Sequence, residues 1–201
     1  QYLCLLLREQ SETVKAGCRK MKKILITGAG SYIGTSFENY INTNFPDEYT
    51  VDTVDMIGGG WKEKDFSPYD AVFHVAGIAH QKENEKNEHL YYEVNRDLAI
   101  ETAKKSIEDG VKQFVFLSSM SVYGLNEGVI TKDTTPYPKN NYGKSKLQAE
   151  ELLKELTKNK IRLVILRPPM VYGENCRGNY QALRKIALKF PFFPKVKNMR
   201  S

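Results

Sequence analysis

The sequence has little cysteine, with three residues in 201. Cys4, Cys18 and Cys176 have neither Cys-x-x-Cys spacing nor the even number typical of a secreted disulfide framework. We therefore expect a reducing compartment, the cytoplasm. No grouping of His, Cys and Asp has the spacing of metal ligands, so no metal site is predicted.

Long hydrophobic runs are also missing. The longest run near the start, Tyr2 to Leu7, stops at Arg8 and is far shorter than the ~20 residues that span a bilayer. It has neither the basic n-region nor the small-residue cleavage site of a signal peptide. Met21 directly precedes the first strong strand pattern, so we expect residues 1–20 to be an extension outside the domain. No membrane contact is expected.

Positive charge is in modest excess and is unevenly distributed. The formal net charge is +6, yet residues 1–23 hold six basic and two acidic groups, and residues 184–200 hold six basic groups. The stretch between them is therefore net negative. Because the excess comes from two ends of the chain, nucleic-acid binding is not expected. With 41% hydrophobic and 27% charged residues, the composition fits a globular protein with one substantial core.

From Lys22 onward, apolar runs alternate with helical patterns, which is typical of a parallel sheet covered by helices. Connections between parallel strands are right-handed, so this order predicts an α/β fold with a doubly wound parallel sheet of the Rossmann type. The expected domain spans residues 21–175. The predicted strands are Ile24–Thr27, Tyr49–Asp55, Ala71–Val75, Phe114–Leu117 and Ile161–Leu166, and the predicted helices are Tyr32–Ile41, Leu90–Ile107 and Tyr142–Lys158.

A glycine-rich turn, Thr27 to Gly34, follows the first predicted strand and opens the first predicted helix. Glycines at this point let the backbone approach a pyrophosphate, whose charge is met by free N–H groups and the positive helix end. The same turn could also be a plain tight connection between strand and helix. Its place in a parallel sheet favours dinucleotide binding.

Asp55 ends the second predicted strand, about twenty residues after the turn. A carboxylate there can accept hydrogen bonds from the adenosine ribose and repel a 2′-phosphate. Asp55 could instead be an ordinary turn residue, and Lys62 and Lys64 lie close enough in the sequence to bind such a phosphate. NAD is therefore the expected cofactor, with NADP as the alternative.

Tyr142 and Lys146 lie four residues apart, which places the phenol and the ammonium on one face of a helix. A neighbouring cation favours the ionised phenol, so Tyr142 could take a proton from a sugar hydroxyl near neutral pH. Ser119 follows the preceding strand and could bind the same oxygen at the edge of the sheet where ligands bind. The alternative is that all three residues have structural roles only.

These residues resemble a known family, the extended short-chain dehydrogenase/reductases, and in particular its NAD-dependent epimerase/dehydratase group. The resemblance runs from Lys22 to about Tyr172. It rests on Thr27 to Gly34, His74-Val75-Ala76-Gly77, Val94-Asn95, Leu117 to Gly124, Tyr142 to Lys146 and Leu166-Arg167-Pro168.

The resemblance implies a role for each matched position. Ser119, Tyr142 and Lys146 would be the catalytic residues, and Ser119, Met120 and Ser121 would bind substrate. The implied cofactor-binding residues are Gly28, Ile33 and Gly34 for the pyrophosphate, Asp55 for the ribose, Asp65 and Phe66 for the adenine edge, and Val75, Ala76, Gly77 and Asn95 for the nicotinamide half. Gly30, Ser31, Tyr32, Tyr142, Lys146 and Pro169 are further implied contacts of the cofactor.

Two positions and one connecting segment depart from the family pattern. Ser31 stands where the family usually has glycine, and Met170 stands where many epimerases have an asparagine that helps to hold the diphosphate. Only residues 56–70 separate the second and third predicted strands, where the family normally has a helix, a strand and another helix. We therefore expect one drastically shortened crossover.

The resemblance implies an enzyme, most simply an NAD-dependent 4-epimerase of a nucleotide sugar such as a UDP-hexose, acting through a 4-keto intermediate. The alternatives are an NAD(P)H-dependent reductase of a nucleotide-linked 4-keto-6-deoxy sugar and a non-catalytic dinucleotide-sensing module. Residues 176–201 are expected to begin a substrate-binding region that is largely missing. A homodimer is expected at full length.

Overall fold

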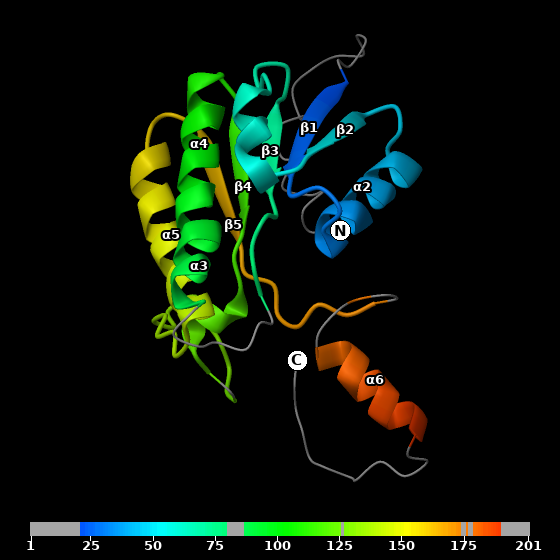
Figure 1. The fold of residues 1–201 in the computed structure, drawn as a ribbon, viewed down its shortest axis with the longest axis vertical. Helices are drawn as coiled ribbons and strands as arrows, with labels where there is room; N and C mark the ends of the chain where they lie inside the picture. Colours follow the sequence, from blue (N-terminus) through cyan, green and yellow to red (C-terminus); the bar gives the residue numbers. More distant parts are fainter. Residues whose placement is uncertain (1–20, 80–86, 126, 174–175, 177–178, 190–201) are drawn as a thin grey trace.

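The structure is a computed structural model that describes residues 21–79, 87–125, 127–173, 176 and 179–189. The expected extension at residues 1–20 lies outside the described residues, as do most of residues 176–201. The predicted fold class is confirmed in the described part, which is a parallel sheet covered by helices on both faces (Figure 1).

Five parallel strands form the sheet in the order β2-β1-β3-β4-β5. They are β1 (Lys22–Thr27), β2 (Tyr49–Val54), β3 (Ala71–His74), β4 (Gln113–Leu117) and β5 (Arg162–Leu166). The chain passes outward from β1 to β2 and then crosses to the other side of β1, so Thr27 is in register with both Val54 and His74. This reversal leaves a crevice at the carboxyl ends of β1 and β3, where sheets of this type bind ligands.

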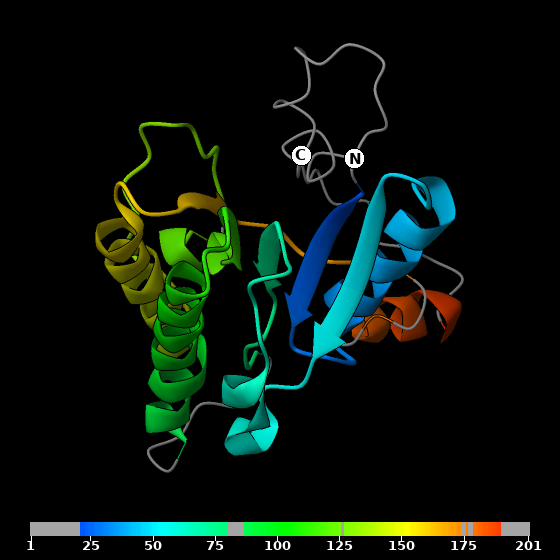
Figure 2. The ribbon, with the colours of Figure 1, turned by 90° about the horizontal axis from the view of Figure 1, so that it is seen from above.

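Two hydrophobic layers separate the sheet from its helices. One face packs on α2 (Tyr32–Asn44), and the other packs on α4 (Leu98–Glu108) and α5 (Asn141–Thr157) (Figures 1 and 2). Successive strand residues alternate between the faces, so that Val72 faces α4 and Phe73 faces α2. α6 (Asn179–Lys189) lies beyond the edge where the strands end (Figure 1).

The expected shortened crossover is present between β2 and β3. Residues 56–70 hold one short 3₁₀ segment, η1 (Ile57–Glu63), in place of a helix, a strand and another helix. Gly58 and Gly59 have φ angles of 75° and 79°, a conformation that glycine adopts readily. Trp61 and Phe66 from this segment are buried in the core, which anchors it against the sheet.

The helix predicted over Leu90–Ile107 is a succession of three elements. These are α3 (Glu88–Tyr92), the π-helical turn η2 (Glu93–Asp97) and α4. The π turn contains Asn95, which is fully buried and hydrogen-bonded away from its own helix. Such turns are rare and occur often at functional sites. No helix of the described residues is long and apolar enough to cross a membrane.

His74, at the end of β3, is a core residue. It is fully buried, its Nδ1 shares a hydrogen bond of 2.8 Å with the Thr27 hydroxyl, and its ring stacks on Phe114 and Phe116. Its Nε2 has no hydrogen-bond partner among the described residues. Burial, reinforced by the charge of Lys146, lowers the pKa of His74 to about 3.

We predict that His74 makes the fold sensitive to acid. Below pH 6.5 the unfolded chain takes up a proton on this imidazole, whereas the folded chain takes it up only near pH 3, so the free energy of unfolding falls as the pH decreases between these values. The contribution is at most about 1.4 kcal/mol per pH unit. When the free energy of unfolding is measured by urea denaturation between pH 4 and 7, its slope against pH should be smaller for His74→Phe than for the wild type. The same substitution at His89, which is exposed, should leave the slope unchanged, and equal slopes for all three proteins would contradict the prediction.

Candidate active site

The glycine-rich turn lies between β1 and α2, at the reversal point of the sheet. Gly28 and Gly30 have φ angles of 112° and 72°. A Cβ on Gly28 would lie 2.8 Å from the Ala76 backbone nitrogen, so the turn packs directly on the segment after β3. A side chain at Gly28 would therefore both strain the backbone and push the two segments apart.

Ser31, which the family pattern gives as glycine, is the N-cap of α2. Its hydroxyl accepts a hydrogen bond from the Gly34 N–H at 3.2 Å. Serine is a favoured N-cap, because its oxygen satisfies one of the free N–H groups of the first turn. The first turn of α2 has no acidic residue, so this helix end stays suited to an anion.

Gly34 brings α2 close to the sheet. A Cβ at this position would lie 2.6 Å from Ser31 Oγ, 3.1 Å from Ile26 Cγ2 and 3.2 Å from Val75 Cγ2. Real Cβ atoms essentially never approach other atoms as closely as the first of these distances. The helix end therefore keeps its place only with glycine here.

The three candidate catalytic residues come from two elements. Ser119 follows β4 and caps η3 (Met120–Tyr123), with its Oγ accepting from the Ser121 N–H at 3.1 Å. Tyr142 is in the first turn of α5, and its phenol is hydrogen-bonded to the Ser119 side chain. Lys146 is one turn further along α5, where its Nζ donates to Leu117 O at 2.9 Å and lies 4.8 Å from the centre of the Phe116 ring.

The electrostatics of this pair differ from the sequence-based expectation that Lys146 lowers the pKa of Tyr142. Burial raises the pKa of Tyr142, and the hydrogen bond with Ser119 only partly opposes this. Burial also lowers the pKa of Lys146 to about 7, against the opposing charge of Glu150. Desolvation is the largest cause of both pKa shifts, and spacing along a helix cannot reveal it. The group that titrates near neutral pH is therefore the lysine.

Asn95 and Gly77 form the wall beside Lys146. Asn95 Oδ1 accepts from the Ile78 N–H at 2.9 Å, and its Nδ2 donates to Ile78 O at 3.1 Å and to Ser145 Oγ at 3.3 Å. A Cβ on Gly77 would lie 2.8 Å from Asn95 Oδ1 and 3.2 Å from Lys146 Nζ. Asn95 thus links the segment after β3 to α5 through its bonds to Ile78 and Ser145. Gly77, which has no side chain, leaves the space next to Lys146 Nζ open.

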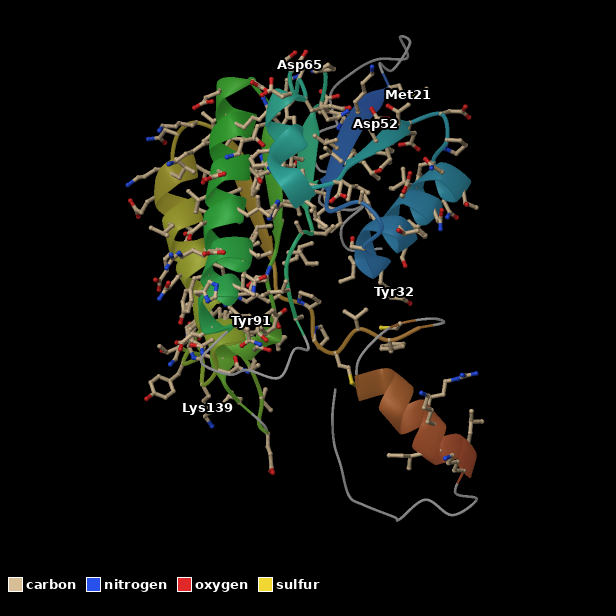
Figure 3. All side chains as sticks on the ribbon, viewed as in Figure 1. Met21, Tyr32, Asp52, Asp65, Tyr91 and Lys139 are labelled. Carbon is tan, nitrogen blue, oxygen red and sulfur yellow. The ribbon has the colours of Figure 1, made fainter. Side chains whose placement is uncertain are left out.

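A cleft of about 570 Å³ at the carboxyl ends of the strands joins these parts. Figure 3 shows Tyr32 at this edge of the sheet. The cleft is lined by several of the predicted residues, namely Ser31, Tyr32, Ile33, Val75, Gly77, Ser119, Met120, Ser121, Tyr142, Lys146 and Pro169. Gly34 packs against Ser31 and Val75, and Asn95 is hydrogen-bonded to Ile78. Gly28 and Ala76 contact each other and are not among the lining residues, and Gly30 belongs to the same turn as Gly28.

Sequence reasoning missed other residues that line the cleft. Ile78 and Ala79 follow β3, Ser118 follows β4, and Pro168, Met170 and Val171 follow β5. Cys176 is buried and also lines the cleft. Their positions in the sequence could have indicated these residues, because the residues that directly follow parallel strands meet at one edge of the sheet, where ligands bind.

The predicted adenine contacts, Asp65 and Phe66, do not reach this cleft. Phe66 is fully buried in the core and its N–H donates to Asp109 Oδ2 at 2.8 Å, while the Asp65 carboxylate accepts from Ser67. Figure 3 shows Asp65 near Met21, at the edge where the strands begin. The shortened crossover explains the difference, because it carries these residues back along the sheet. The structure therefore does not support their adenine role.

Asp55 stays beside the glycine turn. It directly follows β2, and Val54 O accepts from the N–H groups of both Gly28 and Ala29, at 2.9 and 3.1 Å. The exposed Asp55 side chain accepts from the Ile57 N–H through Oδ1 at 3.0 Å. This is the contact of a turn residue, so the ribose role of Asp55 stays a prediction.

The sheet order, the glycine turn at the reversal point and the cleft at the strand ends define a dinucleotide-binding α/β domain of the Rossmann type. Comparison with known proteins narrows this class. Residues 24–190 match the NAD dependent epimerase/dehydratase family, and the chain belongs to that family.

Similar proteins include several sugar 4-epimerases. The chain is 32% identical to a UDP-glucose 4-epimerase of Vibrio cholerae over 92% of this chain and 64% of that protein. It is 31% identical to the N-acetyl-alpha-D-glucosaminyl-diphospho-ditrans,octacis-undecaprenol 4-epimerase of Escherichia coli O157:H7, over 82% of this chain and 54% of that protein. The chain thus spans between about half and two thirds of the length of these relatives.

Solved structures agree with this assignment. A UDP-glucuronic acid 4-epimerase from Bacillus cereus, in complex with NAD, has a TM-score of 0.70 and 26% identity, over 83% of this chain and 63% of that one. A dTDP-4-dehydrorhamnose reductase from Bacillus anthracis, in complex with NADP, has a TM-score of 0.69 at 23% identity over 85% of this chain and 61% of that one. The second likeness shows the fold alone.

We predict that the Lys146 ammonium titrates near neutral pH. Burial lowers its pKa to about 7, so its ¹³Cε resonance should move with a midpoint near that value, well below the ordinary lysine value of about 10.4. The signal is assigned as the one lost in Lys146→Met and retained in Lys144→Met, a change of an exposed lysine on the same helix. A midpoint near 10 would show that the side chain is hydrated.

Proposed function

We propose that this chain binds NAD in the cleft and acts in the 4-epimerisation of a nucleotide sugar, such as a UDP-hexose. The observation that carries the proposal is that one cleft is lined by Ser31, Tyr32 and Ile33 of the glycine-rich turn and by Ser119, Tyr142 and Lys146. The relatives named above, which are 4-epimerases, support the reaction type. We also propose that the protein acts in the cytoplasm, that it forms a homodimer at full length, and that residues 21–175 form its cofactor-binding domain.

The residues present fit NAD. Gly28 and Gly34 leave no room for side chains between the turn, α2 and the sheet, and the start of α2 is the helix end that would meet the charge of a pyrophosphate. Asp55 directly follows β2 beside the turn, where it would accept hydrogen bonds from the adenosine ribose and disfavour a 2′-phosphate. The lysines that could offset this charge have other contacts, since Lys62 pairs with Glu101 at 3.0 Å and Lys64 lies 5.6 Å from the Tyr69 ring centre.

The chain's own residues would handle the proton. When bound, NAD would supply the acceptor for the hydrogen on the sugar C4. The Tyr142 phenol, buried and hydrogen-bonded to Ser119, is the group able to exchange a proton with the C4 oxygen. Ser119 would hold that oxygen, and Lys146, titrating near neutral pH, would supply a positive charge as the phenol ionises.

The test of the reaction is incubation of the protein at its full natural length with a panel of UDP- and dTDP-sugars, without added cofactor, followed by NMR. An epimerase regenerates its cofactor in each cycle, so 4-epimers should accumulate catalytically. Product formation only with stoichiometric NADPH would favour the reductase alternative. NAD binding without any turnover would favour a sensing module, and either result would overturn the proposed reaction.

We predict that Gly34→Val abolishes NAD binding. The valine would collide with Ser31 Oγ, Ile26 and Val75 and push the N-terminus of α2 away from the turn. Isothermal titration calorimetry should show no measurable binding, although circular dichroism shows a folded protein. Asn42→Val introduces the same side chain at an exposed position of α2 and should bind normally. Unchanged affinity of a folded Gly34→Val protein would remove the turn from the cofactor site.

We predict that Tyr142→Phe lowers turnover by at least about 10²-fold with little change in NAD affinity. The ring and its contact with Tyr91 are retained, whereas the group that exchanges the proton is lost. Steady-state kinetics on the substrate found in the panel check this. Tyr137→Phe, at an exposed tyrosine, is the matched control. Near-normal turnover of Tyr142→Phe would place the proton chemistry elsewhere.

A further inference from the structure

α5 carries a third ionisable group that the mechanism above does not use. Glu150 lies one turn after Lys146 and two turns after Tyr142, and it is fully buried. Its Oε1 accepts from Ser118 Oγ at 2.5 Å and from Arg167 Nε at 2.9 Å, and its Oε2 accepts from Arg167 Nη2. One carboxylate therefore binds the residue after β4 and the residue after β5.

Arg167 extends these contacts to residues 119–123, here called the serine turn, which comprise η3 and its cap Ser119. Its Nη1 donates to the Tyr123 hydroxyl at 2.5 Å, and its guanidinium carbon lies 4.9 Å from the centre of the Tyr123 ring. Tyr123 ends η3, the turn that Ser119 caps at its other end. Through Ser118 and Tyr123, Glu150 and Arg167 thus hold both ends of the segment that carries Ser119 and Ser121.

Stability alone does not account for such a pair. Burying the Glu150 carboxylate costs several kcal/mol, while the Arg167 side chain keeps 22% of its surface exposed, and well-packed apolar residues of similar size are often equally stabilising. The pair instead fixes an orientation, because two parallel N–H···O bonds set the angle between the Arg167 guanidinium and the Glu150 carboxylate. Here the fixed angle is that between α5, with Tyr142 and Lys146, and the end of β4, with Ser119.

We propose that Glu150 is a positioning residue, whose buried carboxylate aligns Ser119 with Tyr142 and Lys146 by joining α5 to Ser118 and Arg167. The catalytic part of this proposal rests on the proposed function, whereas its geometric part does not. Glu150 also acts on Lys146 through its charge, which opposes the lowering of the lysine pKa by burial. The other titratable groups facing Lys146 are Tyr142 on its own helix and His74 from β3.

The kinetic test replaces the whole pair, because removal of one partner would leave an unpaired buried charge and could prevent folding. Glu150→Met with Arg167→Met should fold with nearly unchanged thermal stability, yet its kcat should fall at least about tenfold while KM changes little, because small misplacements of reacting groups are costly. Lys112→Met with Asp70→Met removes an ion pair before β3 and β4, at the edge of the sheet away from the cleft, as the control and should change neither constant. Wild-type kcat in a folded Glu150→Met/Arg167→Met protein would overturn the proposal.

A second test needs no substrate. In the same double variant, amide hydrogen exchange of residues 119–123 should quicken at least tenfold, while that of β1 and β3 stays unchanged. The double variant also lacks the Glu150 charge, so the ¹³Cε titration midpoint of Lys146 should move below its wild-type value. Unchanged exchange in the double variant would overturn the proposal even if epimerase activity is found. Faster exchange in a protein that turns over no sugar would support the alignment and count only against the proposed function.

Discussion

The reversal of strand order between β1 and β3 is the constraint on which the rest of this structure depends. The chain moves from β1 outward to β2 and then returns to the other side of β1, so helices must cover both faces of the sheet. At the reversal point no helix can cover the ends of both β1 and β3. The glycine turn, the wall around Gly77 and the serine turn all meet at this one gap, although they are far apart in the sequence.

Desolvation is the second common theme, because the groups behind the cleft are packed as tightly as the core. Burial moves the pKa of Lys146 to about 7 and that of His74 to about 3, and it raises the pKa of Tyr142. Glu150 accepts hydrogen bonds from Ser118 and Arg167 in the same environment. The site therefore combines a tyrosine and a lysine whose charged forms are disfavoured by burial with an ion pair whose carboxylate is fully buried. This arrangement suits proton exchange near neutral pH.

The sequence-based errors have physical causes that can be identified. The helix over Leu90–Ile107 is interrupted because Asn95 bonds to Ile78 and Ser145, which are distant in the sequence. The family pattern placed Asp65 and Phe66 beside the adenine, but the crossover of residues 56–70 returns to β3 too soon. Asp65 lies near the opposite edge of the sheet, and Phe66 is buried in the core. A family pattern carries over position by position only where the connecting segments have the family's length.

The sequence by itself determined the strands, the glycine turn, the spacing of Tyr142 and Lys146, and through these the family. These features are local, because apolar alternation, backbone freedom and helical periodicity act over a few residues. Only the tertiary structure decided the pKa of each buried group, the place of Phe66 in the core, and the joining of Glu150 to Ser118 and Arg167. Burial and buried hydrogen bonds depend on which distant segments pack together, and that partner choice is made by the whole sheet.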